Sequence, residues 1–149
     1  MTSFIADSNL RTLLQVDTLL VLVLMSTSNY TSVLRVSRRA YANPEDYAQK
    51  RLPLPASFDA DASVARSRRI HLNHLENVLP FLLLSLLYAL TQPSHALFAG
   101  LLWSFLIARV TYSGFYALGL QPHRTIAYTA GLLIQVAIAI LTLVAALAS

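Results

Sequence analysis

The chain has 149 residues, of which 56% are hydrophobic and only 12% are charged. Because soluble domains carry about 25% charged residues, this composition and a mean hydropathy of +0.56 exclude an ordinary water-soluble domain and indicate an integral membrane protein. The net charge is +4 and there is no cysteine, which excludes disulfides, thiolate metal ligands and a cysteine nucleophile.

Four apolar segments follow one another, and each has the roughly 20 residues that a membrane-spanning helix needs. They cover about residues 11–39, 64–90, 95–118 and 124–148, and the one long loop covers about 40–63. In that loop, Asn43-Pro44-Glu45-Asp46 predicts a turn and a short helix, because proline and acids suit a first helical turn. Pro80 predicts a kink or an early end inside the second span. We therefore predict one domain over residues 1–149, an all-α membrane protein built as a four-transmembrane-helix bundle.

Basic residues gather at one end of the predicted bundle. Those that border the long loop are Arg35, Arg38, Arg39, Lys50, Arg51, Arg66, Arg68 and Arg69. Arg124 borders the loop between the third and fourth spans, whereas the opposite end of the bundle has Arg11. Under the positive-inside rule, both basic loops are expected in the cytoplasm and both termini on the other side. Membrane topology and contact with anionic lipid headgroups thus explain the net positive charge of the chain, and no nucleic-acid partner is predicted.

The second span begins with a polar stripe. Its members are Arg66, Arg69, Asn73 and Glu76. They are three or four residues apart and so share one helix face. A charged side chain at the centre of a membrane helix costs about 2.5–3.5 kcal/mol and usually faces a protein interior or a water-filled cavity. Polar groups on the other spans that are expected at the same end are Arg35, Arg109, Tyr112, Tyr116, Arg124, Thr125 and Tyr128.

The residue types in this expected site indicate an anionic ligand. Arginine forks bind carboxylates through two hydrogen bonds, whereas Glu76 would accept from an ammonium group. An arginine or a hydroxyl near a thiol stabilises its thiolate, and each unit by which the thiol pKa falls corresponds to about 1.4 kcal/mol. A small zwitterion with more carboxylates than amines fits these groups. Glutathione is one such ligand, and the residues alone leave other anionic ligands open.

Some of the polar residues have simpler interpretations. Arg109 lies well inside the third span, where it would pair with Glu76 or with a backbone carbonyl. His71 and His74 have a spacing that can bind a metal on one helix. Because the sequence offers no third matching ligand for them, no metal site is predicted.

Three motifs at these positions resemble a known family. They are Tyr41-Ala42-Asn43-Pro44-Glu45-Asp46, the run from Arg68 to Asn77 followed by Pro80-Phe81, and Ala108-Arg109 with Tyr116 and Leu120-Gln121-Pro122-His123-Arg124. In this order and spacing they resemble the family of membrane-associated proteins in eicosanoid and glutathione metabolism (MAPEG). Met25-Ser26-Thr27 is similar to the microsomal glutathione transferase 1 branch of that family. The likeness covers roughly residues 25–128.

The resemblance implies a homotrimer of four-helix protomers, with glutathione bound as a co-substrate between neighbouring protomers near the cytoplasmic side. The residues that would contact or frame glutathione are Arg35, Arg68, Arg69, His71, Asn73, Glu76, Tyr112, Tyr116, Arg124, Thr125 and Tyr128. Arg124 matches the position associated with the thiolate, and Tyr116 or Thr125 would assist by hydrogen bonding. Asp46 matches an acid near the site.

The function that the resemblance implies is a microsomal-type glutathione transferase. Such an enzyme conjugates glutathione to lipophilic electrophiles that arrive through the bilayer, and it also reduces lipid hydroperoxides with glutathione. The implied location is the endoplasmic reticulum membrane and the mitochondrial outer membrane, or the inner membrane of a bacterium.

Two positions depart from the family pattern. Tyr112 stands where the family often has histidine, so it suits glutathione contact or, like Tyr116, ordinary aromatic packing. Leu72 stands where the prostaglandin synthases of the family have a basic residue, which favours a transferase. The alternatives left open are an eicosanoid synthase or isomerase of the same family, a non-catalytic lipid-binding scaffold, and an unrelated four-span structural protein.

Overall fold

The computed structural model describes residues 7–58 and 60–148, which form five helices and no strand. The helices are α1 (Ser8–Ser37), α2 (Pro44–Gln49), α3 (Ala62–Leu90), α4 (His95–Leu118) and α5 (His123–Ala148). All of them except α2 are long and apolar enough to cross a membrane. The prediction of an all-α protein with four membrane spans is therefore confirmed. The largest difference in bounds is at the first span, which begins at Ser8 rather than near residue 11.

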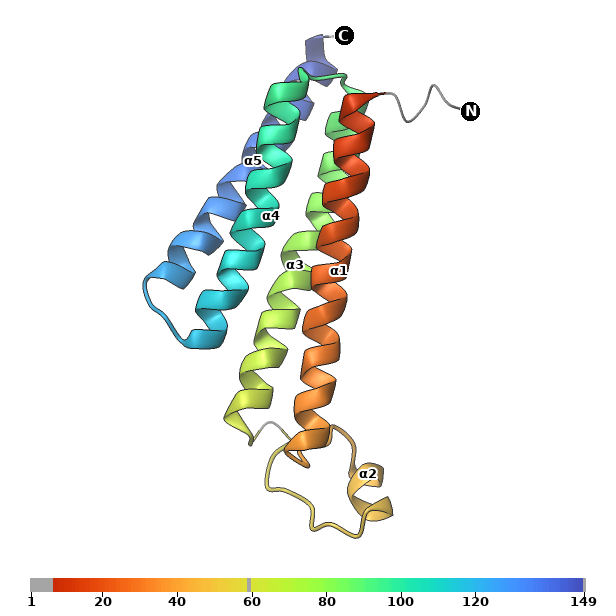
Figure 1. Ribbon diagram of the computed structural model, residues 1–149, viewed down its shortest axis with the longest axis vertical. Helices are drawn as coiled ribbons and strands as arrows, with labels where there is room; N and C mark the ends of the chain where they lie inside the picture. The colour runs from red at the N-terminus through yellow and green to blue at the C-terminus, as the bar shows by residue number, and fades with distance from the viewer. Residues whose placement is uncertain (1–6, 59, 149) are drawn as a thin grey trace.

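The four long helices run side by side as an elongated bundle (Figure 1). They pack most extensively in two pairs, α1 with α3 and α4 with α5, and α3 also contacts α4 and α5. We call the end near α2 the loop-side end and the end where α1 begins the distal end. α1 and α3 extend further toward α2 than α4 and α5 do, so the loop-side end is uneven (Figure 1).

An apolar core fills the distal half of the bundle. Its fully buried members include Val16, Leu20, Val78, Phe81, Phe98, Leu102, Phe105 and Ile138. The rings of Phe81 and Phe105 are stacked, with centroids 3.7 Å apart and planes 2° from parallel. These residues come from all four long helices, so this distal core holds the bundle together.

Local signals set the start and the course of α3. The Asp61 side chain accepts hydrogen bonds from two backbone N–H groups of the first turn, which caps the helix. The helix continues through Pro80, so an early end at this proline is a wrong expectation. Proline has no N–H to donate, and near it the Gln135 side chain of α5 donates to the carbonyl oxygen of Asn77. This hydrogen bond ties α5 to α3 one turn before the proline.

The long loop contains the predicted short helix, α2, which begins at Pro44. The ring of Tyr47 packs against Tyr41 and Phe58, with centroids 5.5 and 6.0 Å away. The loop therefore has a small aromatic core of its own at the loop-side end.

Candidate functional site

Two arginines from different helices contact the side chain of Tyr116 at the loop-side end. Arg69 Nε of α3 donates to Tyr116 Oη of α4 at 3.1 Å. The guanidinium carbon of Arg124 of α5 lies 4.5 Å from the Tyr116 ring centroid, which is a cation–π contact. We call these three residues the Tyr116 cluster. It gathers two positive charges and a hydroxyl where three helices converge.

Arg124 stands in the first turn of α5, where the helix N-terminus carries a partial positive charge. A cation there is unfavourable by itself, so an anion bound against Arg124 would be favoured by both charges. The Gln121 side chain, in the amide orientation that satisfies its neighbours, accepts from Arg124 Nε at 3.0 Å and donates to Thr125 Oγ1 at 3.0 Å. Gln121 therefore positions the arginine and engages Thr125 within the turn.

Arg109 of α4 is fully buried, with 0% of its surface exposed. Its Nη2 donates to the carbonyl oxygen of Tyr128 at 3.2 Å, and its Nη1 donates to Asn73 Oδ1 at 3.5 Å. Its guanidinium carbon lies 5.0 Å from the ring centroid of Phe105. Of the two partners expected for this arginine, Glu76 and a backbone carbonyl, the described residues show the carbonyl. Arg109 therefore bridges α3, α4 and α5 between the distal core and the Tyr116 cluster.

Gly131 of α5 makes room for this arginine. A Cβ atom at Gly131 would lie 2.8 Å from Arg109 Cζ and 2.9 Å from Arg109 Nε. Real Cβ atoms do not approach other atoms so closely, and Arg109 Nε is already buried without a hydrogen-bond partner among the described residues. Any side chain at position 131 would therefore displace the arginine.

Tyr112 connects the level of Arg109 with the Tyr116 cluster. It is buried, and its ring centroid lies 5.6 Å from that of Tyr116 and 6.2 Å from that of Tyr128. The Arg109 guanidinium carbon lies 5.7 Å from the same ring. These contacts favour the packing interpretation for Tyr112, whereas the half-buried Tyr116 presents its hydroxyl to a cation.

The polar stripe of α3 lies on the outer face of the bundle. Arg69 and Glu76 are exposed and Asn73 is half-buried. Glu76 lies about 21 Å along α3 from Ala62, at 1.5 Å per residue. An exposed carboxyl group at this depth of a membrane-spanning helix is costly against lipid. This face therefore has to meet water, a ligand or another protein chain.

Other predicted site residues lie on different elements or faces. Arg35, near the end of α1, donates from Nη1 to a backbone carbonyl oxygen of the following turn at 3.2 Å. His71 of α3 turns toward α1, with Nδ1 3.1 Å from Thr27 Oγ1. Asp46 lies in α2, and Arg68 is exposed in the first part of α3. One protomer thus assembles the part of the predicted site that comes from α3, α4 and α5.

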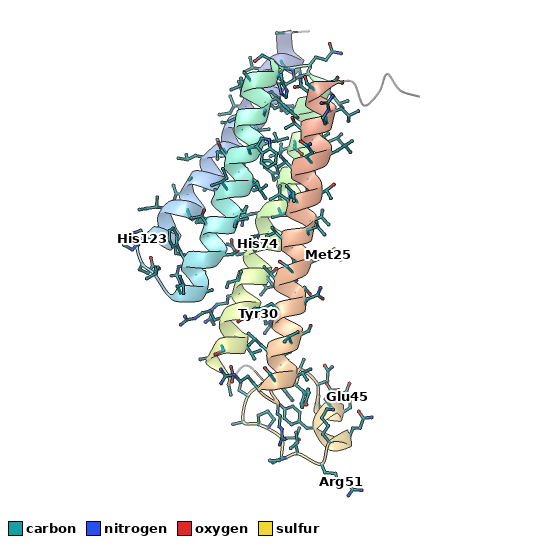
Figure 2. The ribbon with its side chains drawn as sticks, in the orientation of Figure 1. Met25, Tyr30, Glu45, Arg51, His74 and His123 are labelled. Atoms are coloured by element: carbon teal, nitrogen blue, oxygen red, sulfur yellow. The ribbon has the colours of Figure 1, made fainter. Side chains whose placement is uncertain are left out.

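Sequence reasoning missed a polar contact that ties α3 to α4 beside the site. His74 is fully buried, and its Nε2 bonds with Ser113 Oγ of α4. Figure 2 labels His74 on α3. Ser113 also donates to the carbonyl oxygen of Arg109 at 3.2 Å. His71 and His74 thus face different helices. The available signal was that Ser113 follows Arg109 by four residues, and that a histidine inside a membrane span needs a polar partner.

Comparisons with known proteins agree with the motifs. The model of the MAPEG family matches residues 13–144. The chain is 35% identical over 117 residues to microsomal glutathione S-transferase 1 of Mus musculus, which covers 76% of each chain. It is 36% identical over 113 residues to microsomal glutathione S-transferase 1 of Homo sapiens, covering 74% of this chain and 72% of that protein. It is 32% identical over 114 residues to prostaglandin E synthase of Homo sapiens, covering 76% and 74% of the two chains.

Proposed function

Since the chain belongs to the MAPEG family, we propose that it is a membrane-bound glutathione transferase that conjugates glutathione to lipophilic electrophiles. The observation that carries this proposal is the Tyr116 cluster, where arginines of α3 and α5 meet on one phenol. Two guanidinium groups and a hydroxyl suit a ligand that has carboxylates and an ionised thiol. The names of the microsomal glutathione S-transferase 1 relatives agree with that ligand.

In the proposed reaction, the glutathione thiol loses its proton to water, and the thiolate sulfur attacks an electrophilic carbon. The leaving group, such as a halide, departs with its bonding electrons. Arg124 stabilises the thiolate by its charge, and the Tyr116 hydroxyl, which accepts from Arg69, keeps its own proton to donate to the sulfur. The Thr125 hydroxyl accepts from Gln121 and also keeps its proton, so Tyr116 or Thr125 would donate the assisting hydrogen bond. Lowering a thiol pKa from about 8.5 to about 6.5 needs about 2.7 kcal/mol of preferential thiolate stabilisation.

The outer face of α3 would hold the rest of the tripeptide. Arg69 suits a carboxylate and the exposed Glu76 suits the ammonium group, with Asn73 between them. We propose that the chain forms a homotrimer in which a neighbouring protomer covers this face and supplies Arg35. Such a neighbour would also account for an exposed carboxyl group inside a membrane-spanning helix. His71 and Arg68 would frame the same site, and Asp46 would approach it from the loop.

The second substrate would enter from the bilayer. With a lipid hydroperoxide, the thiolate would attack the terminal peroxide oxygen and break the O–O bond, which gives a lipid alcohol and glutathione sulfenic acid. A second glutathione would convert the sulfenic acid to glutathione disulfide and water. We propose the endoplasmic reticulum membrane as the location, with the mitochondrial outer membrane as a second site, or the inner membrane if the host is a bacterium.

An eicosanoid synthase is the second candidate, because prostaglandin E synthase is similar to the chain at 32% identity. It would use glutathione at the same cluster but rearrange an endoperoxide rather than form a conjugate. Leu72, which is exposed on α3, favours the transferase, because the resemblance expects a basic residue there in the prostaglandin synthases.

The test is the rate at which the purified, detergent-solubilised protein conjugates glutathione to a generic aryl halide. Removing one preorganised electrostatic group typically lowers kcat by about 100–1,000-fold, so we expect such a loss for Arg124→Ala. Arg38→Gln, at an exposed arginine that caps α1, is the matched control and should retain the wild-type rate. Equal rates for wild type and Arg124→Ala would refute the thiolate role. If calorimetry showed no glutathione binding, the proposal that the protein is a glutathione-dependent enzyme would be refuted.

The shared site has a separate test. Arg124→Ala and Arg35→Ala would each be inactive as pure proteins, since each removes one arginine from every site. In trimers mixed at random from both variants, about a quarter of the sites would carry both arginines if neighbours contribute them. Recovery of about a quarter of the wild-type activity supports the shared site. No recovery, or only monomers in native mass spectrometry, would count against it.

A further inference from the structure

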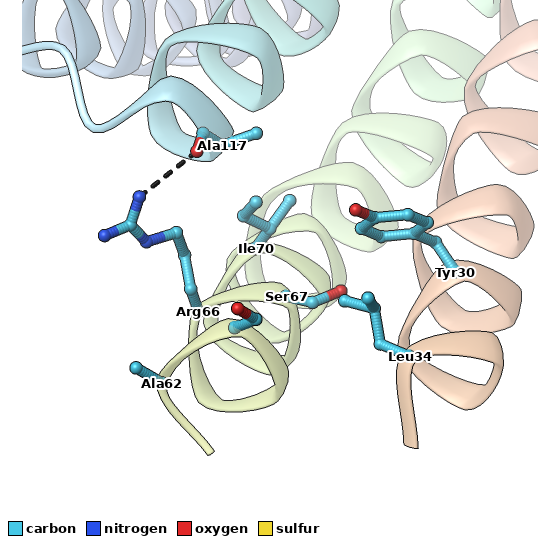
Figure 3. A pocket seen from close by; sticks show the side chains of 8 residues that line it. Tyr30, Leu34, Ala62, Arg66, Ser67, Ile70 and Ala117 are labelled. Carbon is cyan, nitrogen blue, oxygen red and sulfur yellow. Dashed lines mark hydrogen bonds between the residues drawn. The ribbon is translucent and has the colours of Figure 1, made fainter. Parts of the chain in front are cut away.

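A second hollow lies beside the polar stripe, over the face of α3 that carries Ser67 and Ile70, and Arg66 is the stripe member that lines it. Two adjoining cavities of about 250 and 420 Å³ open between α1 and α4 at the loop-side end, with α3 as their floor. Both are lined by Tyr30, Ser67, Ile70 and Ala117, so they form one continuous hollow, which we call the α1–α4 groove. Figure 3 shows its loop-side part, with α1 on one side and the end of α4 on the other.

The mouth of the α1–α4 groove carries a positive charge. Arg66 lines the groove near the start of α3, and its Nη1 donates to the carbonyl oxygen of Ala117 at 3.2 Å (Figure 3). Gly119, just past the end of α4, lies beside the same guanidinium group, since a Cβ there would be 3.3 Å from Nη1. The hydrogen bond to Ala117 fixes the Arg66 guanidinium group at the mouth of the groove. Because Arg66 is exposed, its charge remains accessible to a ligand.

The deeper part of the groove does not demand a polar ligand. It is lined by Ile70, Ala117 and the Tyr30 side chain, together with hydroxyl groups. The lining serine and threonine hydroxyls already have hydrogen-bond partners within the protein; they are Ser26, Thr27, Ser67 and Ser113. Because hydroxyls that are bonded internally need nothing from a ligand, an alkyl chain can lie against them with little desolvation cost. The Tyr30 hydroxyl, which turns toward the groove (Figure 3), is the polar group that the chain has to pass.

We propose that the α1–α4 groove binds a single-chain anionic amphiphile from the bilayer. Its acyl chain lies along Ile70 between α1 and α4, and its anionic head pairs with Arg66 at the mouth. A volume of a few hundred Å³ with an apolar wall and a few placed polar groups is typical of small-molecule sites. The head is either a carboxylate, as in a fatty acid, or a phosphate, as in a lysophospholipid.

The charge rather than the chain gives this site its selectivity. An acyl chain that moves from lipid into the groove leaves one apolar environment for another, so burial of the chain contributes little. One arginine near the membrane surface is expected to favour an anionic head by about fivefold in affinity. A second copy of this chain is the less favoured occupant, because the exposed Arg69 and Glu76 place the expected protomer contact on the neighbouring face of α3, away from Ile70.

The experiment measures binding of three single-chain probes to purified protein in detergent by native mass spectrometry. The probes are oleate, oleoyl lysophosphatidate and neutral monooleoylglycerol. For wild type we expect both anionic probes to bind about fivefold more tightly than the neutral probe, and the difference between the two shows which head is preferred. Equal binding of all three probes would overturn the proposal.

Two variants and two matched controls locate the site. Ala117→Phe fills the groove and should reduce binding of all probes by at least about tenfold, whereas Ala96→Phe, exposed near the start of α4, should not. Arg66→Gln should lower only anionic binding, by about fivefold, whereas Arg38→Gln should leave it unchanged. Unchanged binding in Ala117→Phe would place the amphiphile elsewhere and sink the proposal.

A measurement on wild-type protein locates the site independently, in case Ala117→Phe does not fold. A fatty acid with a photoreactive diazirine on its chain should label residues 26–34, 67–70 and 113–117, which surround the groove. Labelling confined to other segments, or crosslinks from these segments to a second copy of the chain, would contradict the assignment. Neither readout requires glutathione, so failure here is distinguishable from failure of the proposed enzyme.

Discussion

The distal and loop-side halves of this bundle are built from the same four helices but by different contacts. In the distal half, side chains such as Phe81 and Phe105 stack directly, with centroids 3.7 Å apart. In the loop-side half, the helices meet through hydrogen bonds such as Arg69 to Tyr116 and His74 to Ser113, and two cavities remain open. Tight packing in one half allows the other half to keep polar groups and empty space for ligands.

The difference has a physical cause. Lipid tails are as apolar as leucine, so helices in a bilayer gain little from the hydrophobic effect and associate by close packing and by hydrogen bonds. The distal half relies mainly on packing, with a hydrogen bond from Ser85 to Asp17 between α3 and α1, whereas the loop-side half uses hydrogen bonds that also present charge. Arg109 lies at the boundary between the two halves. It contacts the ring of Phe105 in the distal core and the rings of Tyr112 and Tyr128 in the loop-side half.

The largest predicted effect comes from closing the space at that boundary. Gly131→Ala would drive a methyl group into the Arg109 guanidinium and break its contacts to Asn73 and Tyr128. Each hydrogen bond made by a charged group contributes about 1.5–3 kcal/mol, and two are lost here, so thermal unfolding in detergent should occur at a much lower temperature. The matched control is Gly114→Ala, because a Cβ there meets nothing within 4 Å. That control should be neutral or slightly stabilising, by up to about 1 kcal/mol. Equal melting temperatures for the two variants would mean that Arg109 does not link the halves.

The second effect concerns the distal core. Phe81→Ala should destabilise the bundle by about 3 kcal/mol, the low end for phenylalanine in soluble cores, because in lipid the packing loss remains while the transfer loss shrinks. The measurement is unfolding in detergent, with Leu83→Ala at an exposed position as control. Glutathione affinity of the remaining folded protein should be unchanged. A loss of affinity without a loss of stability would reverse the roles of the two halves.

The sequence predicted the four spans and the short helix at Pro44 because hydrophobic length and turn residues are local signals. It also predicted that Arg69, Tyr116 and Arg124 belong together, since helical periodicity and the family motifs place them on converging faces. It could not place His74 against Ser113 or Arg109 against Gly131, because these contacts depend on the relative rotation of packed helices. The position of Arg35 relative to the cluster depends on neighbouring protomers, which no periodicity within one chain determines.

A smaller effect tests the chemistry of the loop-side half. Tyr116→Phe keeps the ring beneath Arg124 but removes the hydroxyl that accepts from Arg69. A hydrogen bond to a charged group such as the thiolate contributes about 1.5–3 kcal/mol, so kcat/KM for glutathione conjugation should fall by about 13–160-fold with little change in stability. Tyr88→Phe, at a buried tyrosine of the distal core, is the control and should leave kcat/KM unchanged. If Tyr116→Phe lowers stability instead of kcat/KM, the tyrosine only packs.

The smallest effect concerns a carboxyl group in the distal half. Asp17 Oδ2 accepts from Ser85 Oγ at 2.9 Å, while Oδ1 is buried without a hydrogen-bond partner among the described residues. Ser85 Oγ also lies 2.9 Å from the carbonyl oxygen of Leu82, so the hydroxyl can give its one proton to that oxygen when Asp17 is replaced. Asp17→Leu therefore removes an unsatisfied polar atom without creating another, and stability should stay level or rise by up to about 1 kcal/mol. Ser85→Ala should act in the opposite direction, because it leaves the carboxyl group with less hydrogen bonding than before. If Asp17→Leu instead lost conjugating activity at unchanged stability, chemistry would extend into the distal half and the division between the halves would fail.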